Sequence, residues 1–263
     1  MRLVWCTDIH LNFLKRADAP KAFIEYVRSE TACDAIVVTG DITEAQLIDP
    51  HLAQILSTET PVYFVLGNHD YYNSSFSRVN QLVTDKYGTS WLGHPASYVK
   101  LTDNTVLIGQ DGWYDARAAD PYKSTFDMSD WFVIADFRGL NKDGIVRKCR
   151  EMAGEQAQIA KIKLEKAAKE YKNIIFATHY PPFIGASWHQ GKVSDKAALP
   201  WFASTIMGEA LLDIATKFPN VKFDVLCGHC HSSGIYKPID NVIVKTGAAR
   251  YGFPDIAGVL EIE

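Results

Sequence analysis

The chain has 263 residues, of which 47% are hydrophobic and 22% charged, and its formal net charge at pH 7 is −4. This composition is typical of a globular protein whose core needs no disulfide bonds to fold. The acidic balance disfavours nonspecific nucleic-acid binding, although it does not exclude a local basic groove. No apolar stretch approaches the roughly 18 residues of a transmembrane helix, and no signal peptide precedes the first apolar run, so we expect a cytoplasmic protein without a membrane partner.

The cysteines also favour a reducing compartment. They are odd in number and widely separated, and several lie in apolar runs, namely Cys6, Cys33, Cys149, Cys227 and Cys230. This pattern predicts buried thiols rather than a disulfide framework.

The first third of the chain alternates short apolar runs with helical patterns. Residues 3–6, 35–38 and 62–66 are rich in Val, Ile and aromatics and too short for helices, which predicts buried parallel strands. Apolar spacing predicts helices at 20–30, 44–58 and 74–88, the second one broken or restarted at Pro50. The β-α-β-α-β order predicts a parallel sheet with right-handed crossovers.

The rest of the chain is richer in strands. A turn at 102–104 predicts a hairpin, and apolar runs predict strands at 173–178, 221–226, 241–244 and 256–260. Helices are expected at 145–172, as a long surface helix with a solvated charged face, and at 200–218. Residues 112–143 show no period and are interpreted as an irregular insertion. Because no linker or repeat interrupts the sequence, we expect residues 1–263 to form a single domain.

Polar residues follow five of the expected strands. Taken singly, an Asp or His after a strand is more often a helix cap or a satisfied polar group. Taken together, they place ligand-type side chains at one sheet edge, where α/β proteins bind ligands. The residues are Asp8 and His10, Asp41, Asn68 with His69 and Asp70, His179, and His229 with His231.

This set of side chains favours a metal site. Oxygen and imidazole ligands without thiolate suit divalent ions such as Mn, Fe, Zn or Ni. The set is larger than one tetrahedral ion needs. Two ions roughly 3.5–4 Å apart that share a carboxylate would use it better, and such a pair clamps an in-line displacement at phosphorus.

Five sequence blocks resemble, in their order, the pattern of calcineurin-like metallophosphoesterases. They are Asp8-x-His10, Gly40-Asp41, Gly67-Asn68-His69-Asp70, His179 and Gly228-His229-x-His231. The resemblance spans residues 8–231. It implies an α/β fold class, namely a four-layer α/β/β/α sandwich in which two mixed β-sheets lie between helical layers and the metal pair sits at the sheet edge.

The resemblance also implies a role for each residue. One ion would be bound by Asp8, His10 and His231, the other by Asn68, His179 and His229, with Asp41 bridging the two. A hydroxide between the ions would attack phosphorus opposite the leaving group. His69 would face the leaving oxygen and donate a proton or stabilise charge. Asp70 would fix the tautomer and orientation of His69.

Two features distinguish this chain within the pattern. Ile42-Thr43-Glu44-Ala45 follows Asp41 where serine/threonine protein phosphatases continue with Asp-Arg-Gly, and Asp70 stands where they carry Glu, which disfavours a protein phosphatase. Cys227-Gly228-His229-Cys230 is also the active-site string of thioredoxin-like disulfide isomerases. A redox Cys-x-x-Cys should open a helix, whereas a loop is expected after His231, so this alternative is disfavoured.

The sequence therefore predicts an enzyme that hydrolyses a phosphate ester, either a phosphodiester or a small phosphorylated metabolite. A nuclease of the same fold and a catalytically silent scaffold for partner binding stay open as alternatives, and the oligomeric state is not defined. Aromatic and basic residues in expected loops either form a substrate rim or, as we favour, cover the insertion. These are Tyr71, Tyr72, Trp113, Tyr114, Arg117, Trp188, His189, Arg250 and Tyr251.

Overall fold

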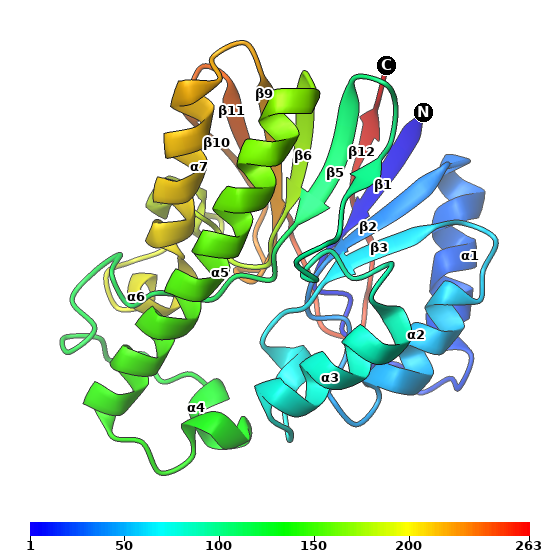
Figure 1. The fold of residues 1–263 in the computed structure, drawn as a ribbon. Coiled ribbons are helices and arrows are strands. Elements are labelled where there is room, and N and C mark those ends of the chain that lie inside the picture. The colour runs from blue at the N-terminus through cyan, green and yellow to red at the C-terminus, as the bar shows by residue number, and fades with distance from the viewer.

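The computed structural model describes residues 1–263 and contains two large mixed β-sheets (Figure 1). The first sheet has the order β12 (Ile256–Glu261), β1 (Arg2–Cys6), β2 (Ala35–Thr39) and β3 (Val62–Val65). Strands β1, β2 and β3 are parallel, and β12 is antiparallel to β1. The three buried parallel strands predicted from the N-terminal apolar runs are thus confirmed.

The second sheet has six strands. Its order is β10 (Gly234–Ile239), β11 (Val242–Thr246), β9 (Lys222–Cys227), β6 (Asn173–Ala177), β5 (Thr105–Gly109) and β4 (Val99–Lys100). The four inner strands are parallel and both edge strands are antiparallel, so β4 and β5 form the expected hairpin. Strand β10 was not predicted, because as an edge strand it alternates exposed and half-buried residues and lacks a continuous apolar run.

Three apolar cores separate four layers. Between the sheets, Trp5 and Val37 of the first pack with Leu107 and Ile175 of the second. The outer face of the first sheet carries α1 (Ala19–Thr31), α2 (Ile48–Leu56) and α3 (Phe76–Tyr87), and that of the second carries α5 (Lys142–Glu170) and α7 (Thr205–Lys217) (Figure 1). This is the α/β/β/α sandwich that the resemblance implied.

Two predicted helices differ from the prediction in their continuity. Helix α2 begins at Ile48, so Pro50 lies in its first turn, where a missing N–H does no harm, and the helix is not broken. The helix expected at 200–218 is two helices, α6 (Leu199–Phe202) and α7. Between them Ala203 is extended and the N–H of Ser204 donates to Pro181 O at 2.9 Å. This break leaves the carbonyl of Trp201 free of α7.

The segment 112–143 is irregular apart from α4 (Asp130–Val133), a 3₁₀ turn, η3 (Ala135–Phe137), and its last two residues, which begin α5. It is nevertheless part of the core. Trp113 and Tyr114 are almost fully buried and pack against Tyr180, a residue of the segment after β6. The remaining short elements are η1 (Leu11–Phe13), η2 (His69–Tyr71), η4 (Ile184–Ala186) and the hairpin β7 (Trp188–His189) with β8 (Lys192–Val193).

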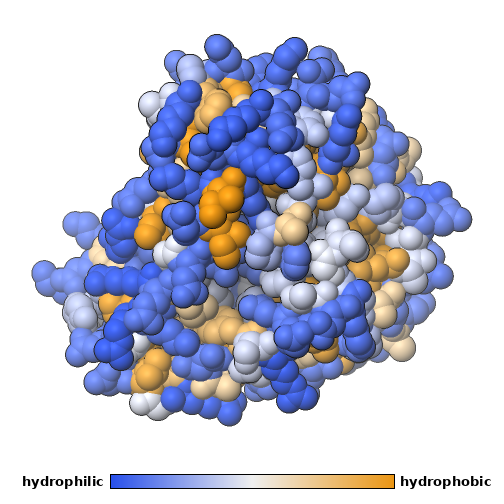
Figure 2. All heavy atoms as spheres, in the orientation of Figure 1, coloured by the Kyte–Doolittle hydropathy of each residue, from blue (hydrophilic) through white to orange (hydrophobic).

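No helix of the structure is both long and apolar enough to cross a membrane. On the face seen in Figure 2, hydrophilic side chains predominate and hydrophobic ones appear in separate groups. This distribution is ordinary for a folded chain in water.

Helix α5 differs from the simple surface helix that the sequence predicts. Lys163 is only 4% exposed, and its Nζ donates to Leu92 O at 2.6 Å and Gly109 O at 2.8 Å. The N–H of Leu92 donates to Phe64 O in β3 of the first sheet. Lys163 therefore links α5 and β5, which belong to the second sheet and its helical layer, to a segment bonded to the first sheet. Burial lowers the pKa of Lys163 to about 8, against the opposing effect of Asp111.

The lowered pKa of Lys163 predicts a pH-dependent stability. Between about pH 8 and the unfolded pKa of about 10.4, the unfolded chain binds more protons than the folded one, so stability rises with pH. The free energy of unfolding of the wild type, relative to that of Lys163→Met, should rise by up to about 1.4 kcal/mol per pH unit in this window. Urea denaturation of both proteins between pH 7 and 10 measures this difference. A difference that does not change with pH would contradict the prediction.

Candidate metal centre

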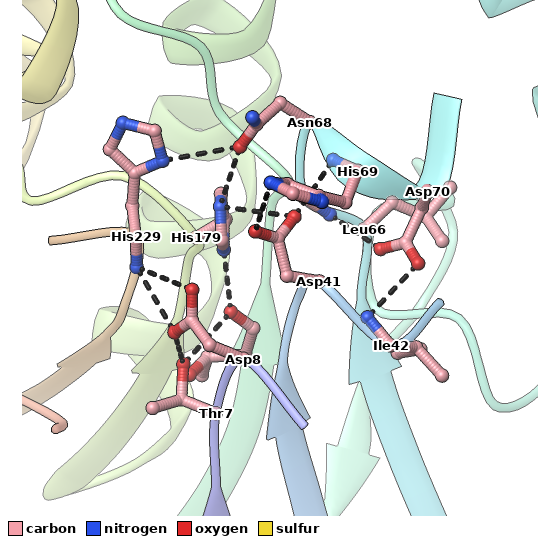
Figure 3. A network of polar contacts seen from close by, with 12 residues as sticks. Thr7, Asp8, Asp41, Ile42, Leu66, Asn68, His69, Asp70, His179 and His229 are labelled. Atoms are coloured by element: carbon pink, nitrogen blue, oxygen red, sulfur yellow. Dashed lines mark hydrogen bonds and ion pairs between the residues drawn. The ribbon is translucent and has the colours of Figure 1, made fainter. Parts of the chain in front are cut away.

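The predicted site residues converge at the edge where β1, β2 and β3 of one sheet meet β6 and β9 of the other (Figure 3). Each lies just past the end of its strand. Asp8, Asp41, Asn68 and His179 are buried, and the side chains of His69 and His231 are 15% and 21% exposed. The edge is therefore a partly covered cluster of carboxylates and imidazoles.

The backbone of this edge is strained. Nine non-glycine residues of the chain have positive φ, and five of them belong to the site. Left-handed backbone is costly for residues with a side chain and persists where the surrounding structure enforces it. It turns the chain sharply after the strands and directs the side chains to the edge. The five are Asp8 (φ 48°), His10 (41°), Asp41 (51°), His229 (67°) and His231 (58°).

Two glycines allow the loops to approach one another closely. A Cβ added at Gly67 would collide with the carboxylate of Asp41 and lie 2.7 Å from a ring carbon of His179. A Cβ at Gly228 would collide with Thr7 and Asp8. The crowded edge therefore needs glycine at both positions.

One half of the cluster contains Asp8, His10, Asp41 and His231, whose potential ligand atoms all lie within 4.8 Å of one another. The Nε2 atoms of His10 and His231 are 3.2 Å apart, and His231 Nε2 lies 3.3 Å from Asp8 Oδ1. His10 Nε2 lies 3.7 Å from Asp41 Oδ2. This arrangement of donor atoms suits a divalent ion.

The other half is centred on Asn68. Its Oδ1 lies 3.2 Å from His179 Nε2 and 3.1 Å from His229 Nδ1, and His179 Nε2 is 3.5 Å from Asp41 Oδ1 (Figure 3).

Backbone carbonyls hold the remote nitrogens of both imidazoles. His179 Nδ1 lies 2.9 Å from Thr39 O, and His229 Nε2 lies 3.2 Å from Trp201 O, the carbonyl at the break between α6 and α7. Such bonds fix the tautomer so that the other nitrogen, with its lone pair, faces the site.

The pKa shifts of the cluster favour the binding of a cation. Burial, together with the charges of Asp8 and Asp70, raises the pKa of Asp41 well above its usual value. Burial also opposes ionisation of Asp8, but the hydrogen bond from His231 and the surrounding histidines lower its pKa. Burial lowers the pKa of His10 and His229, which keeps these imidazoles neutral. Neutral imidazoles beside crowded carboxylates are the donor set that a metal ion binds, so the residues fit the expected cofactor.

His69 is placed differently from the other histidines. Its ring stacks on Tyr72 with centroids 4.2 Å apart, and its Nε2 lies 3.9 Å from Asp41 Oδ2. Its backbone N–H donates to Asp41 Oδ1 at 2.9 Å. Its Nδ1 is buried without a partner. The imidazole lines the pocket over the cluster, which is where a substrate would enter.

The sequence predicts that Asp70 orients the imidazole of His69, but in the structure the carboxylate bonds to backbone N–H groups instead. Its Oδ1 accepts the N–H group of Ile42 at 3.0 Å (Figure 3) and that of Thr43 at 2.9 Å. Its Oδ2 accepts the N–H group of Gly67 at 2.8 Å. The carboxylate thus ties together the loops that carry Asp41 and Asn68. The expected control of the His69 tautomer is replaced by a clamp on the backbone. Sequence spacing alone could not reveal this, because Asp70 points away from its neighbour.

The pocket over the cluster has a volume of about 340 Å³. One wall comes from residues 126–129 of the insertion. The lining residues are Asp41, Asn68, His69, Tyr72, Phe126, Asp127, Met128, Ser129, His189, Phe202, His229, Cys230, His231 and Tyr251.

Neither interpretation of the aromatic and basic residues holds for all of them. Tyr72, His189 and Tyr251 line the pocket, whereas Trp113 and Tyr114 are buried in the core. Arg117 forms a surface ion pair with Glu209 at 2.8 Å.

The two cysteines beside the site are not a redox pair. Cys227 and Cys230 are free and fully buried, and burial raises the pKa of both thiols. No helix follows Cys230, since the chain continues through a loop into β10. The thioredoxin-like alternative therefore lacks structural support.

A sequence model of the calcineurin-like phosphoesterase family matches residues 1–233. The chain therefore belongs to this family, as the five sequence blocks had indicated. Family membership makes it a metal-dependent hydrolase of phosphoric ester bonds.

Solved structures share the fold at low sequence identity. A dimetal phosphatase from Danio rerio has a TM-score of 0.58 at 15% identity over 94% of this chain and 87% of its own. GAP50, the anchor in the inner membrane complex of Plasmodium, has a TM-score of 0.51 at 15% identity over 97% and 75%. A putative 5′-nucleotidase from Staphylococcus aureus, in complex with α-ketoglutarate, has 0.50 at 12% over 94% and 49%. No curated protein sequence matches this chain. These likenesses support the fold.

The clamp formed by Asp70 yields a prediction. In Asp70→Asn, the NH₂ group that replaces one carboxylate oxygen cannot accept a hydrogen bond, so at least one buried N–H loses its partner. The free energy of unfolding of the metal-free protein should fall by about 1–3 kcal/mol, measured by urea denaturation. Asp195→Asn is the control, since exposed Asp195 also accepts two backbone N–H groups but water can replace it. An unchanged stability of Asp70→Asn would contradict the clamp.

Proposed function

We propose that the protein hydrolyses a small phosphate ester, either a phosphodiester or a phosphorylated metabolite, at a pair of divalent ions. The observation that carries this proposal is the position of Asp41. Its Oδ2 faces His10 at 3.7 Å, and its Oδ1 faces His179 at 3.5 Å. A carboxylate whose two oxygens face two different sets of ligands is suited to bridge two ions.

The proposed ligands divide along this bridge. Asp8, His10 and His231 would hold one ion, and Asn68, His179 and His229 the other. Since the same ligand types accept several metals, Mn, Fe, Zn and Ni are all candidates. When bound, the ions would supply positive charge to the phosphoryl oxygens and lower the pKa of the attacking water.

The side chains around the ions would orient the substrate. His69 faces the pocket and would donate a hydrogen bond to the leaving oxygen. The stacked ring of Tyr72 restricts the rotation of this imidazole. Asp70 keeps the loops of Asp41 and Asn68 in register, so its contribution would be indirect.

The pocket favours a small substrate over a nucleic acid. None of its lining residues is Lys or Arg, and Asp127 places a carboxylate there. A nuclease would need cationic side chains along the path of the nucleic-acid backbone.

We further propose that residues 1–263 form a single domain. We also propose a cytoplasmic location, which the free cysteines support.

A scaffold without catalysis is the alternative from another class. The structural likeness to GAP50, described as an anchor, is the support for this alternative. Against it, all seven expected ligand positions of this chain carry metal-binding side chains. Elemental analysis of the purified protein separates the two, since a scaffold should carry no stoichiometric metal.

The bridging role of Asp41 is tested by Asp41→Asn. The amide nitrogen cannot ligate a second ion, so bound metal and activity should fall together, activity by at least about 10³-fold. Metal content is measured by elemental analysis, and activity on a phosphodiester, a phosphomonoester, a cyclic nucleotide and a pyrophosphate with Mn²⁺, Ni²⁺ or Zn²⁺. The wild-type rates on this panel also define the substrate class. Full activity after loss of both ions would rule out the proposed chemistry.

His69→Ala should have a different effect. Because its imidazole is proposed to act on the leaving group and not on metal, the variant should keep its metal while kcat falls by about 10²-fold or more. A substrate with a good leaving group, such as a nitrophenyl ester, should be affected less than an alkyl ester. Loss of metal from the variant would instead place His69 among the ligands.

A further inference from the structure

The amide of Asn68 has two partners on the side away from the histidines. Its Nδ2 donates to Asp130 Oδ1 at 2.9 Å and to the hydroxyl of Tyr72 at 3.0 Å. The hydroxyl of Tyr72 in turn donates to the same Asp130 oxygen at 2.7 Å. These three side chains form a closed triangle of hydrogen bonds beside the metal centre.

The triangle is buried in the protein. Asp130 is fully buried, and its second oxygen has no hydrogen-bond partner in the chain. It comes from α4 in the insertion, whereas Asn68 follows β3. A buried carboxylate is costly unless it accepts hydrogen bonds, and here its partners are the amide of a proposed ligand and the tyrosine that stacks on His69.

The triangle selects one orientation of the Asn68 amide. An amide can rotate by half a turn and exchange its oxygen with its nitrogen. In the rotated state the oxygen would face the oxygen of Asp130, and the NH₂ group would face His179 and His229. Because an NH₂ group cannot ligate a metal, only the observed orientation offers Oδ1 to an ion.

We propose that Asp130 is a positioning residue of the metal centre, which holds the amide oxygen of Asn68 towards the second ion. This inference rests on the proposed function, because it takes Asn68 as a ligand of that ion. The insertion thereby contributes to metal binding without supplying a ligand. Partners of this kind change metal affinity by about 10–100-fold when they are removed.

Asp130→Leu tests the proposal, with binding of Mn²⁺ to metal-free protein followed by calorimetry. Leucine has a similar size and accepts no hydrogen bond. We expect the wild type to bind two ions, and the variant to keep one affinity while the other falls by about 10–100-fold. In Asp130→Asn the side-chain oxygen still accepts from Asn68, so this conservative variant should restore most of the lost affinity.

Asp115→Leu is the matched control. Asp115 is also a fully buried carboxylate of the insertion, and it accepts from Thr205 Oγ1 at 2.6 Å and from the N–H of Ile206 at 2.7 Å. It has no partner in the site. Its loss should lower stability and leave both Mn²⁺ affinities unchanged, which separates positioning from general damage to the insertion.

A double-variant comparison identifies the affected ion. Asn68→Ala should weaken the same site as Asp130→Leu, and combining the two should add little further loss, since both act through one amide. If Asp130→Leu does not fold, Asp130→Ala takes its place, and the same loss of affinity is expected at the same ion.

The outcomes distinguish this inference from the proposed function. A wild type that binds no Mn²⁺ stoichiometrically would refute the metal centre itself. A wild type that binds two ions, with Asp130→Leu binding both equally tightly, would overturn only the role of Asp130. Equal weakening of both ions, or the same change in Asp115→Leu, would also overturn it.

Discussion

The structure depends on the burial of two carboxylates, Asp8 and Asp41, at the meeting point of two sheets. Buried negative charges are stable only where hydrogen bonds or cations compensate them. Here backbone N–H groups of His229 and His69 point at them, and neutral imidazoles surround them. The strained turns and the close contacts at Gly67 and Gly228 follow from this requirement, because only tight loops bring so many donors to one place.

The same requirement shapes elements that are distant from Asp8 and Asp41 in the sequence. The break between α6 and α7 presents the carbonyl of Trp201 to His229, which a continuous helix would have kept in its own hydrogen bonds. The backbone clamp of Asp70 and the triangle around Asn68 serve the same purpose for other loops. Irregular segments of this fold are thus as specific in their contacts as its strands.

The sequence predicted best where local signals act. The runs 3–6, 35–38 and 62–66 became strands because their apolar residues are buried on both faces, and the family pattern brought nine polar residues to one edge. Prediction was weaker where contacts between segments distant in the sequence determine the role of a side chain. Asp70 bonds to Ile42 and Thr43, Asp130 bonds to Asn68, and Lys163 bonds to Leu92, and no spacing within the chain announces such partners.

The pairing of β1 with β12 sets the order in which the molecule can be completed during synthesis. Strand β1 carries Asp8 and His10 at its end and gains β2 on one side early, but its other edge remains open until residues 256–261 have left the ribosome. Contacts of such long range form slowly. The edge of β1 that β12 covers in the finished fold is therefore unpaired until residues 256–261 have been synthesised, and it lies beside Asp8 and His10.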